Sequence, residues 1–133
     1  MHTAKIAIAA AAFSLWACAA GAVALSPVDA VGHVGQTANV CGVVASANYA
    51  VGSRANPTFL TLVDPDQVDP NRALTAVIYG NDRAKFGTPE MTLQGQRICM
   101  RGFISYFRGR PEMILSTPTQ LFYDSRSSVA QLQ

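Results

Sequence analysis

Two segments of this chain, sixty positions apart, repeat one layout in which a Gly-Gln pair precedes a run of strand-forming residues. The first covers residues 35–44 and the second covers residues 95–104. Each run contains a cysteine and an interior glycine, Gly42 in the first and Gly102 in the second. A glycine inside a strand indicates a bulge or a sharp bend. Two bent strands in a short chain predict a small closed barrel.

The first 24 residues are expected to be a signal peptide that is not part of the fold. Residues 6–20 are apolar and rich in alanine, and they are too short for a membrane-spanning helix. Residues 22–24 fit the small-x-small rule for signal cleavage, which places the mature start at Leu25. Two alternatives stay open: a retained N-terminal anchor helix, and lipidation at Cys18, which follows a Leu-Trp-Ala box.

Removing residues 1–24 of the 133 leaves 109 residues, which is enough for one domain. We assign this domain to residues 25–124 and a polar tail to residues 125–133. Cleavage also removes Lys5, so nine basic and eight acidic residues remain and the net charge falls from +2 to +1. That balance excludes a protein that wraps duplex DNA by neutralising phosphates. Any contact with nucleic acid would depend on a local patch.

Cysteine usage agrees with export to an oxidising compartment, either the periplasm or the exterior of the cell. Cys41 and Cys99 remain after cleavage, and both lie inside expected strands. A metal site would need ligands beyond two cysteines, and His33 is the one histidine after residue 24. We therefore predict a Cys41–Cys99 disulfide, no metal and no cofactor, with buried free thiols as the alternative.

Beta-branched and apolar runs, separated by clusters of Gly, Pro, Asn and Asp, predict an all-β fold with five strands. After the third strand, Asn81 and Asp82 can cap a short helix that Gly87 ends. A five-stranded Greek-key barrel with one short helix between strands three and four is the oligonucleotide/oligosaccharide-binding (OB) architecture. An antiparallel sandwich is the alternative, but closure removes exposed edges. The expected strands are residues 37–47, 58–63, 74–79, 97–107 and 112–116, and the expected helix is residues 81–86.

The order of short motifs along the chain resembles that of short exported bacterial OB-fold proteins of the nucleic-acid-binding-like kind. The resemblance covers nearly all of the chain after residue 24, and it implies the fold but no activity. One departure is the acidic connector after the second strand, where Asp64, Asp66 and Asp69 replace an aromatic-proline turn. The matching segments are residues 33–36, 40–44, 57–60, 77–80, 85–87, 95–102, 106–111 and 118–121.

Two loops carry residue types that bind single-stranded nucleic acid. In OB barrels the loop after strand one and the loop between strands four and five rise on one side and flank the face of strands two and three. Aromatic faces stack on bases, and arginines bind phosphates or stack as planar cations. We therefore expect weak binding of single-stranded nucleic acid or a nucleotide. The predicted ligand-binding residues are Tyr49, Arg54, Tyr79, Tyr106, Arg108 and Arg110.

The same residues permit other functions. Aromatic side chains also fill barrel ends, and arginines also keep loops soluble, so a protein- or glycan-binding envelope module is the alternative function. Asp64, Asp66 and Asp69 lack the central glycine and terminal glutamate of a calcium loop, which favours a solvated turn. The sequence contains no Gly-x-Ser-x-Gly motif, no histidine-based dyad and no phosphate loop. We therefore expect no enzyme activity, with a metal-dependent nuclease as the remote alternative.

Overall fold

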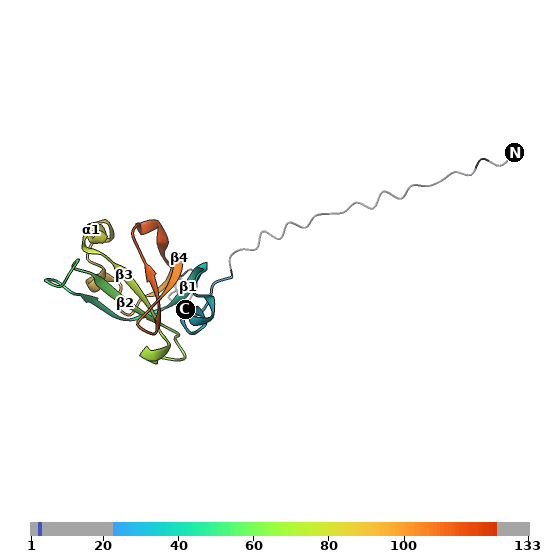
Figure 1. The fold of residues 1–133 in the computed structure, drawn as a ribbon, viewed down its shortest axis with the longest axis horizontal. Coiled ribbons are helices and arrows are strands. Elements are labelled where there is room, and N and C mark those ends of the chain that lie inside the picture. Colours follow the sequence, from blue (N-terminus) through green and yellow to red (C-terminus); the bar gives the residue numbers. More distant parts are fainter. Residues whose placement is uncertain (1–2, 4–22, 125–133) are drawn as a thin grey trace, which may run out of the picture.

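The computed structural model describes Thr3 and residues 23–124 (Figure 1). Most of the expected signal peptide, with Cys18, and the expected tail at residues 125–133 lie outside the described residues. Within the described part of the chain, no helix is long and apolar enough to cross a membrane.

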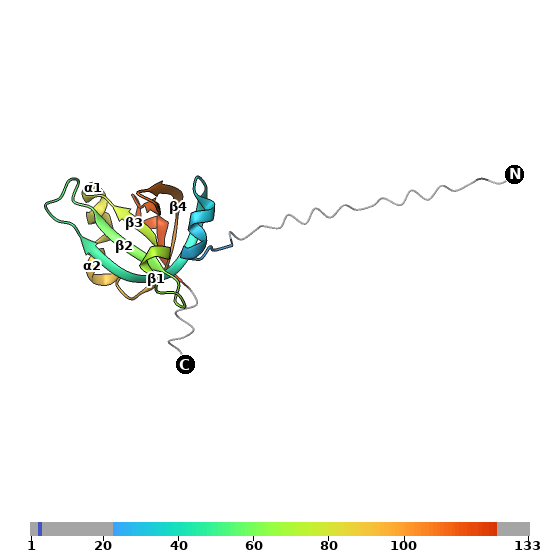
Figure 2. The same ribbon diagram turned by 60° about the horizontal axis from the view of Figure 1, so that its bottom comes forward.

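Six strands form one sheet, and five of them close into an OB-like barrel (Figures 1 and 2). The strand order is β1-β2-β3-β5-β4-β6, and β1 also pairs with β4, which closes the ring. The β3–β5 pair is parallel and the other pairs of these strands are antiparallel. The predicted five-stranded barrel is confirmed, and β6, which was not predicted as a barrel strand, lies against β4. The bounds are β1 Thr37–Tyr49, β2 Thr58–Val63, β3 Leu74–Ile78, β4 Arg97–Phe107, β5 Arg110–Ile114 and β6 Leu121–Tyr123.

The strand bounds match the sequence prediction for β2 and β4 and differ elsewhere. β1 runs on to Tyr49, and β3 ends one residue early at Ile78. The prediction for β5 is wrong, because this strand already begins at Arg110 and includes Pro111. Pro111 pairs with β4 before β5 meets β3 at Glu112, so its missing N–H interrupts no pairing with β3.

The prediction of one helix between β3 and β4 is corrected to three short helical turns. These are α1 (Gly80–Arg83), the 3₁₀ turn η3 (Ala84–Phe86) and α2 (Pro89–Thr92). Gly87 ends η3 as predicted, with a φ of +76° that favours glycine. Other 3₁₀ turns are η1 (Pro27–His33), η2 (Pro70–Arg72) and η4 (Pro118–Gln120). Figure 2 shows η1 on one side of the barrel and α1 and α2 on the other.

The barrel interior is filled by side chains that alternate along the strands. In β2, Leu60 and Leu62 point inward and are fully buried, while Phe59 points outward. Ala30 of η1, Leu93, which follows α2, and Leu115, which follows β5, complete the core from outside the strands. The strand residues of this core are Val40, Val44, Ala47, Leu60, Leu62, Leu74, Ala76, Ile78, Ile98, Met100, Ile104 and Met113.

The two interior glycines do not mark bulges, so the bulge alternative of that prediction is wrong. The pairing of β1 with β4 runs without interruption past Gly42 and Gly102. The register of β1 shifts instead between Val44 and Ser46, in its pairing with β2. Gly42 is required by close packing, because a Cβ there would lie 2.6 Å from the carbonyl oxygen of Val63.

The β4–β5 hairpin turn places an arginine in the left-handed region. Arg108 has a φ of +51° and Gly109 a φ of +80°, the pattern of a two-residue type I′ turn in which asparagine is favoured first. We expect Arg108→Asn to raise the free energy of unfolding by about 1 kcal/mol, because asparagine tolerates this conformation. Urea denaturation measures the change. Arg108→Ala retains the strain and is the control, so an equal gain in both variants would contradict this interpretation.

Candidate ligand-binding site

The candidate site is the solvent-facing side of β2, β3 and β5, which we call the outer wall. Strand register arranges its side chains in two rows that run across the three strands. In the apolar row, Phe59 lies opposite Val77 and Val77 lies beside Ile114. The outer wall consists of Phe59, Thr61, Thr75, Val77, Glu112 and Ile114.

The apolar row offers a solvent-accessible surface for stacking. The Phe59 side chain is 37% exposed and that of Ile114 is 44% exposed, while Val77 between them is buried. On β4, Phe103 is also exposed and precedes Ile104, the partner of Met113 in β5. Three neighbouring strands span roughly 10 Å, which is wide enough for an aromatic ring to lie flat across them.

Glu112 provides the charge on the outer wall. It lies beside Thr75 of β3 and opposite Ser105 of β4, whose hydroxyl donates to the Glu112 carbonyl oxygen at 3.1 Å. Burial raises the pKa of the Glu112 carboxyl above its ordinary value. An ionised carboxylate accepts hydrogen bonds from a ligand, and the protonated form can also donate one.

Tyr49 lies at one end of the barrel, and its ring is already in contact with an arginine. The guanidinium carbon of Arg83 is 3.8 Å from the centroid of the Tyr49 ring. Arg83 of α1 also forms an ion pair with Glu90 of α2. Arg83 therefore covers one face of the Tyr49 ring, so a ligand cannot stack on that face.

Arg54 and Tyr79 lie at the same end of the outer wall, beyond the last residue of β3. The loop between β1 and β2, which carries exposed Arg54, is tied to α1 by a hydrogen bond from the Gly80 N–H to the Ala55 carbonyl oxygen at 2.8 Å. Tyr79 directly follows β3 and is 39% exposed. These two side chains can reach a ligand on the outer wall from that end.

Tyr106, Arg108 and Arg110 belong to the β4–β5 hairpin, at the other end of the outer wall. Arg110 donates to the Asn71 Oδ1 at 3.2 Å and to the Pro70 carbonyl oxygen at 3.4 Å, just before β3 begins. The Arg108 guanidinium lies 5.2 Å from the Phe107 ring centroid. From the sequence, the two loops were predicted to rise together on one side of the barrel. That prediction is wrong, because they flank the outer wall from opposite ends of β3.

Sequence reasoning missed Val77, Glu112 and Ile114 as members of the site. The predicted strand at residues 112–116 already contained Glu112 and Ile114, and alternation places both on one face. Alternation does not say which face is outward or which strand lies alongside, so their position beside β3 was not predicted.

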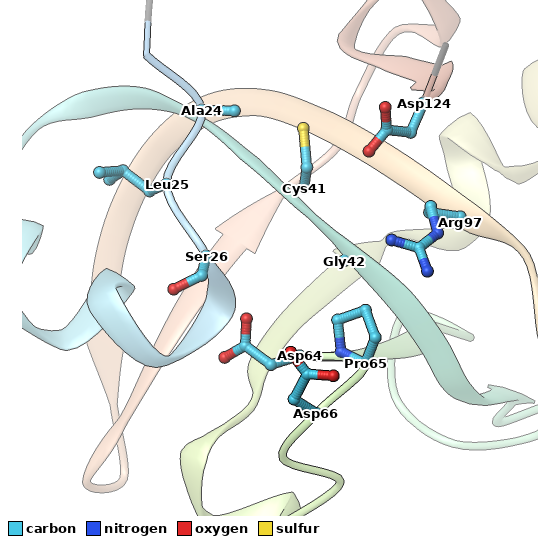
Figure 3. A pocket seen from close by; sticks show the side chains of 10 residues that line it. All are labelled: Ala24, Leu25, Ser26, Cys41, Gly42, Asp64, Pro65, Asp66, Arg97 and Asp124. Carbon is cyan, nitrogen blue, oxygen red and sulfur yellow. The ribbon is translucent and has the colours of Figure 1, made fainter. Parts of the chain in front are cut away.

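Away from the outer wall, a hollow of about 270 Å³ lies beside the disulfide (Figure 3). The predicted Cys41–Cys99 bond is confirmed, and the two cysteines lie directly opposite each other in β1 and β4. Asp64 accepts a hydrogen bond from the Val28 N–H at 3.2 Å, so this part of the acidic connector holds η1. The hollow is lined by Ala24, Leu25, Ser26, Cys41, Gly42, Asp64, Pro65, Asp66, Arg97 and Asp124.

No family model matches the chain, and no curated protein matches its sequence. Solved structures with a similar fold include the OBody AM1L10 bound to hen egg-white lysozyme, at 15% identity over 70% of this chain and 83% of that one, with a TM-score of 0.49. A putative aspartyl-tRNA synthetase from Leishmania major Friedlin matches at 8% identity over 77% of this chain and 21% of that one, with a TM-score of 0.49. The S. pombe Stn1-Ten1 complex matches at 17% identity over 71% of this chain and 62% of that one, with a TM-score of 0.49. Similarity at this level assigns no function.

Proposed function

We propose that the protein is a binding module that holds single-stranded nucleic acid or a nucleotide on its outer wall. The observation that carries the proposal is the exposed Phe59 ring in the apolar row, with Arg54 beyond one end of β3 and Arg108 beyond the other. A base would stack on Phe59, and phosphates would lie towards the two arginines.

The arginines at the two ends of the outer wall set the expected strength of phosphate binding. Arg54 and Arg108 are exposed and lie at opposite ends of β3, a strand that spans roughly 16 Å at about 3.3 Å per residue. Arg110 is also exposed, but its guanidinium already donates to Pro70 and Asn71. Two phosphate contacts on a single strand give a salt slope of about −1.4. Affinity is therefore expected to fall by about sevenfold between roughly 50 and 200 mM salt. Binding of this kind is weak and depends mainly on stacking.

Replacing Phe59 by alanine is expected to lower the affinity for a fluorescein-labelled oligothymidine about tenfold, because base–aromatic stacking contributes about 1–3 kcal/mol. Fluorescence anisotropy at low salt measures the affinity. Phe122→Ala is the matched control, because Phe122 lies on β6 with a similar exposed fraction of 44%. Equal losses in both variants, or no binding by the unmodified protein, would rule out the outer wall as the nucleic-acid site.

A protein- or glycan-binding envelope module is the second candidate, and Glu112 favours it. A carboxylate beside the stacking surface repels phosphates, whereas an uncharged peptide or sugar can donate hydrogen bonds to it. A photo-crosslinking amino acid at position 59 would capture such a partner from an envelope extract. The same amino acid at position 122 is the control. The crosslinking protein is first freed of nucleic acid. Capture of a protein or glycan partner by the position-59 variant, but not by the position-122 variant, would favour this candidate.

We also propose that the protein is exported, with cleavage after Ala24. The Cys41–Cys99 disulfide is compatible with an oxidising compartment. Intact mass of the protein recovered from periplasm or medium tests this: a chain that begins at Leu25 supports it. A lipid adduct on Cys18 or a retained leader would refute cleavage at this position.

A further inference from the structure

Asp124 brings a third metal-ligating side chain to the two cysteines. The two sulfur atoms and a carboxylate oxygen of Asp124 all lie within 4.8 Å of one another. Cys99 is 4% exposed and Asp124 is 6% exposed, while Cys41 lines the hollow. Figure 3 shows the Cys41 sulfur and the Asp124 carboxylate next to each other beside this hollow.

Strand pairing places these three residues together. Cys41 of β1 is the register partner of Cys99 of β4, and Cys99 also pairs with Phe122 of β6. Asp124 directly follows β6, and its backbone N–H donates to the Arg97 carbonyl oxygen at 3.2 Å. Asp124 is therefore fixed beside the cysteines by the strand that the sequence prediction left out of the sheet.

We propose that reduction of the disulfide turns this cluster into a zinc site, with Cys41, Cys99 and Asp124 as three ligands and a fourth position open to the hollow. Thiolates select Zn²⁺ over Ca²⁺ and Mg²⁺, which prefer oxygen ligands. This set also supplies the ligands beyond two cysteines that the sequence did not reveal. The proposal is independent of what the outer wall binds.

The chemistry begins with a dithiol reductant. The reductant gives two electrons and two protons, the Cys41–Cys99 bond breaks into two thiols, and the reductant becomes a disulfide. Two sulfur–zinc bonds then form, and the two thiol protons pass to solvent. The Asp124 carboxylate completes the protein ligands, and water takes the fourth position.

Geometry and charge both suit zinc. Zinc–sulfur bonds of about 2.3 Å and zinc–oxygen bonds of about 2.1 Å place tetrahedral ligand atoms roughly 3.5–3.8 Å apart. Side-chain rotations about the three Cα–Cβ bonds can bring the released sulfurs and the carboxylate to that spacing. The charges of two thiolates, the Asp124 carboxylate, the neighbouring Arg97 guanidinium and Zn²⁺ cancel. Asp64 and Asp66 line the same hollow but are not among the three clustered ligands.

The test compares reduced and oxidised protein in metal titrations, with a phosphine as the reductant. Reduced protein should bind one Co²⁺ with thiolate-to-cobalt charge-transfer absorbance, and Zn²⁺ should displace it. Oxidised protein should show no such bands. Asp124→Asn should weaken zinc binding by the reduced protein at least about tenfold. Asp66→Asn, a carboxylate change in the same hollow, is the control and should alter affinity less than about threefold.

If the reduced chain unfolds without metal, circular dichroism can follow its refolding on addition of Zn²⁺. In that case Zn²⁺ should restore the β spectrum of the reduced protein, and Asp124→Asn should need at least about tenfold more Zn²⁺. Absence of charge-transfer bands in the reduced protein would overturn the proposal. Equal zinc affinity in Asp124→Asn and the unmodified reduced protein would also overturn it.

Discussion

Replacing Cys41 and Cys99 together by alanine is expected to lower the free energy of unfolding by about 4 kcal/mol. The two cysteines are 58 positions apart, and a crosslink that closes so long a loop removes much of the conformational entropy of the unfolded chain. The bond also joins β1 to β4, the pair that closes the barrel. Urea denaturation of the oxidised protein and the double variant measures the difference.

Reduced, metal-free protein is the control for this substitution. Its free energy of unfolding should match that of the double variant within about 1 kcal/mol, because both lack the crosslink. The urea midpoints can be compared directly only if the slope of the unfolding free energy against urea concentration (the m-value) is the same for both proteins. A different m-value would indicate that the unfolded state itself has changed. Equal midpoints for the oxidised protein and the double variant would show that the bond contributes nothing.

Gly42→Ala is expected to cost about 3 kcal/mol, the upper part of the usual range for overpacking. The added Cβ would lie 2.6 Å from the Val63 carbonyl oxygen and 2.7 Å from the Pro27 Cγ. The first atom belongs to the backbone of β2 and the second to a rigid ring at the start of η1. Neither can move aside without shifting a strand or the turn that covers the core.

Gly102→Ala is the matched control, because it adds the same methyl group to the paired strand. Its Cβ would lie 2.9 Å from the Met113 Cγ, 3.0 Å from the Met113 Sδ and 3.2 Å from the Gln120 Nε2. These are atoms of flexible side chains, so we expect a cost of about 1 kcal/mol or less. Thermal or urea denaturation ranks the two variants. A larger cost at Gly102 than at Gly42 would contradict the packing around Gly42.

The barrel could be predicted from the sequence because its strands are marked by local signals, namely alternating apolar residues and turn residues. The bounds of β2 and β4 were predicted correctly from alternation within β2 and from the turn residues that precede and follow both strands. The Cys41–Cys99 disulfide was predicted from the expected oxidising compartment, and the two cysteines do lie opposite each other in β1 and β4. β6 was missed because three residues carry too little periodicity, and its pairing with β4 depends on the finished barrel.

The candidate site was less accessible to sequence reasoning, because its parts meet only after the barrel closes. Tyr49 was identified by residue type, but its contact with Arg83 depends on how α1 packs against the end of β1. Glu112 and Ile114 reach the outer wall through the parallel β3–β5 pair, a contact between segments far apart in the sequence. Asp124 gave no sequence signal for its place beside the cysteines.

Mapping of amide chemical shifts by NMR, during titration with oligothymidine at low salt, tests the proposed binding surface most directly. The proposal predicts shift changes that cluster at Phe59, Val77 and Ile114 and extend to the loops of Arg54 and Arg108. No change at saturating oligonucleotide, or changes confined to η1 and β6, would contradict it.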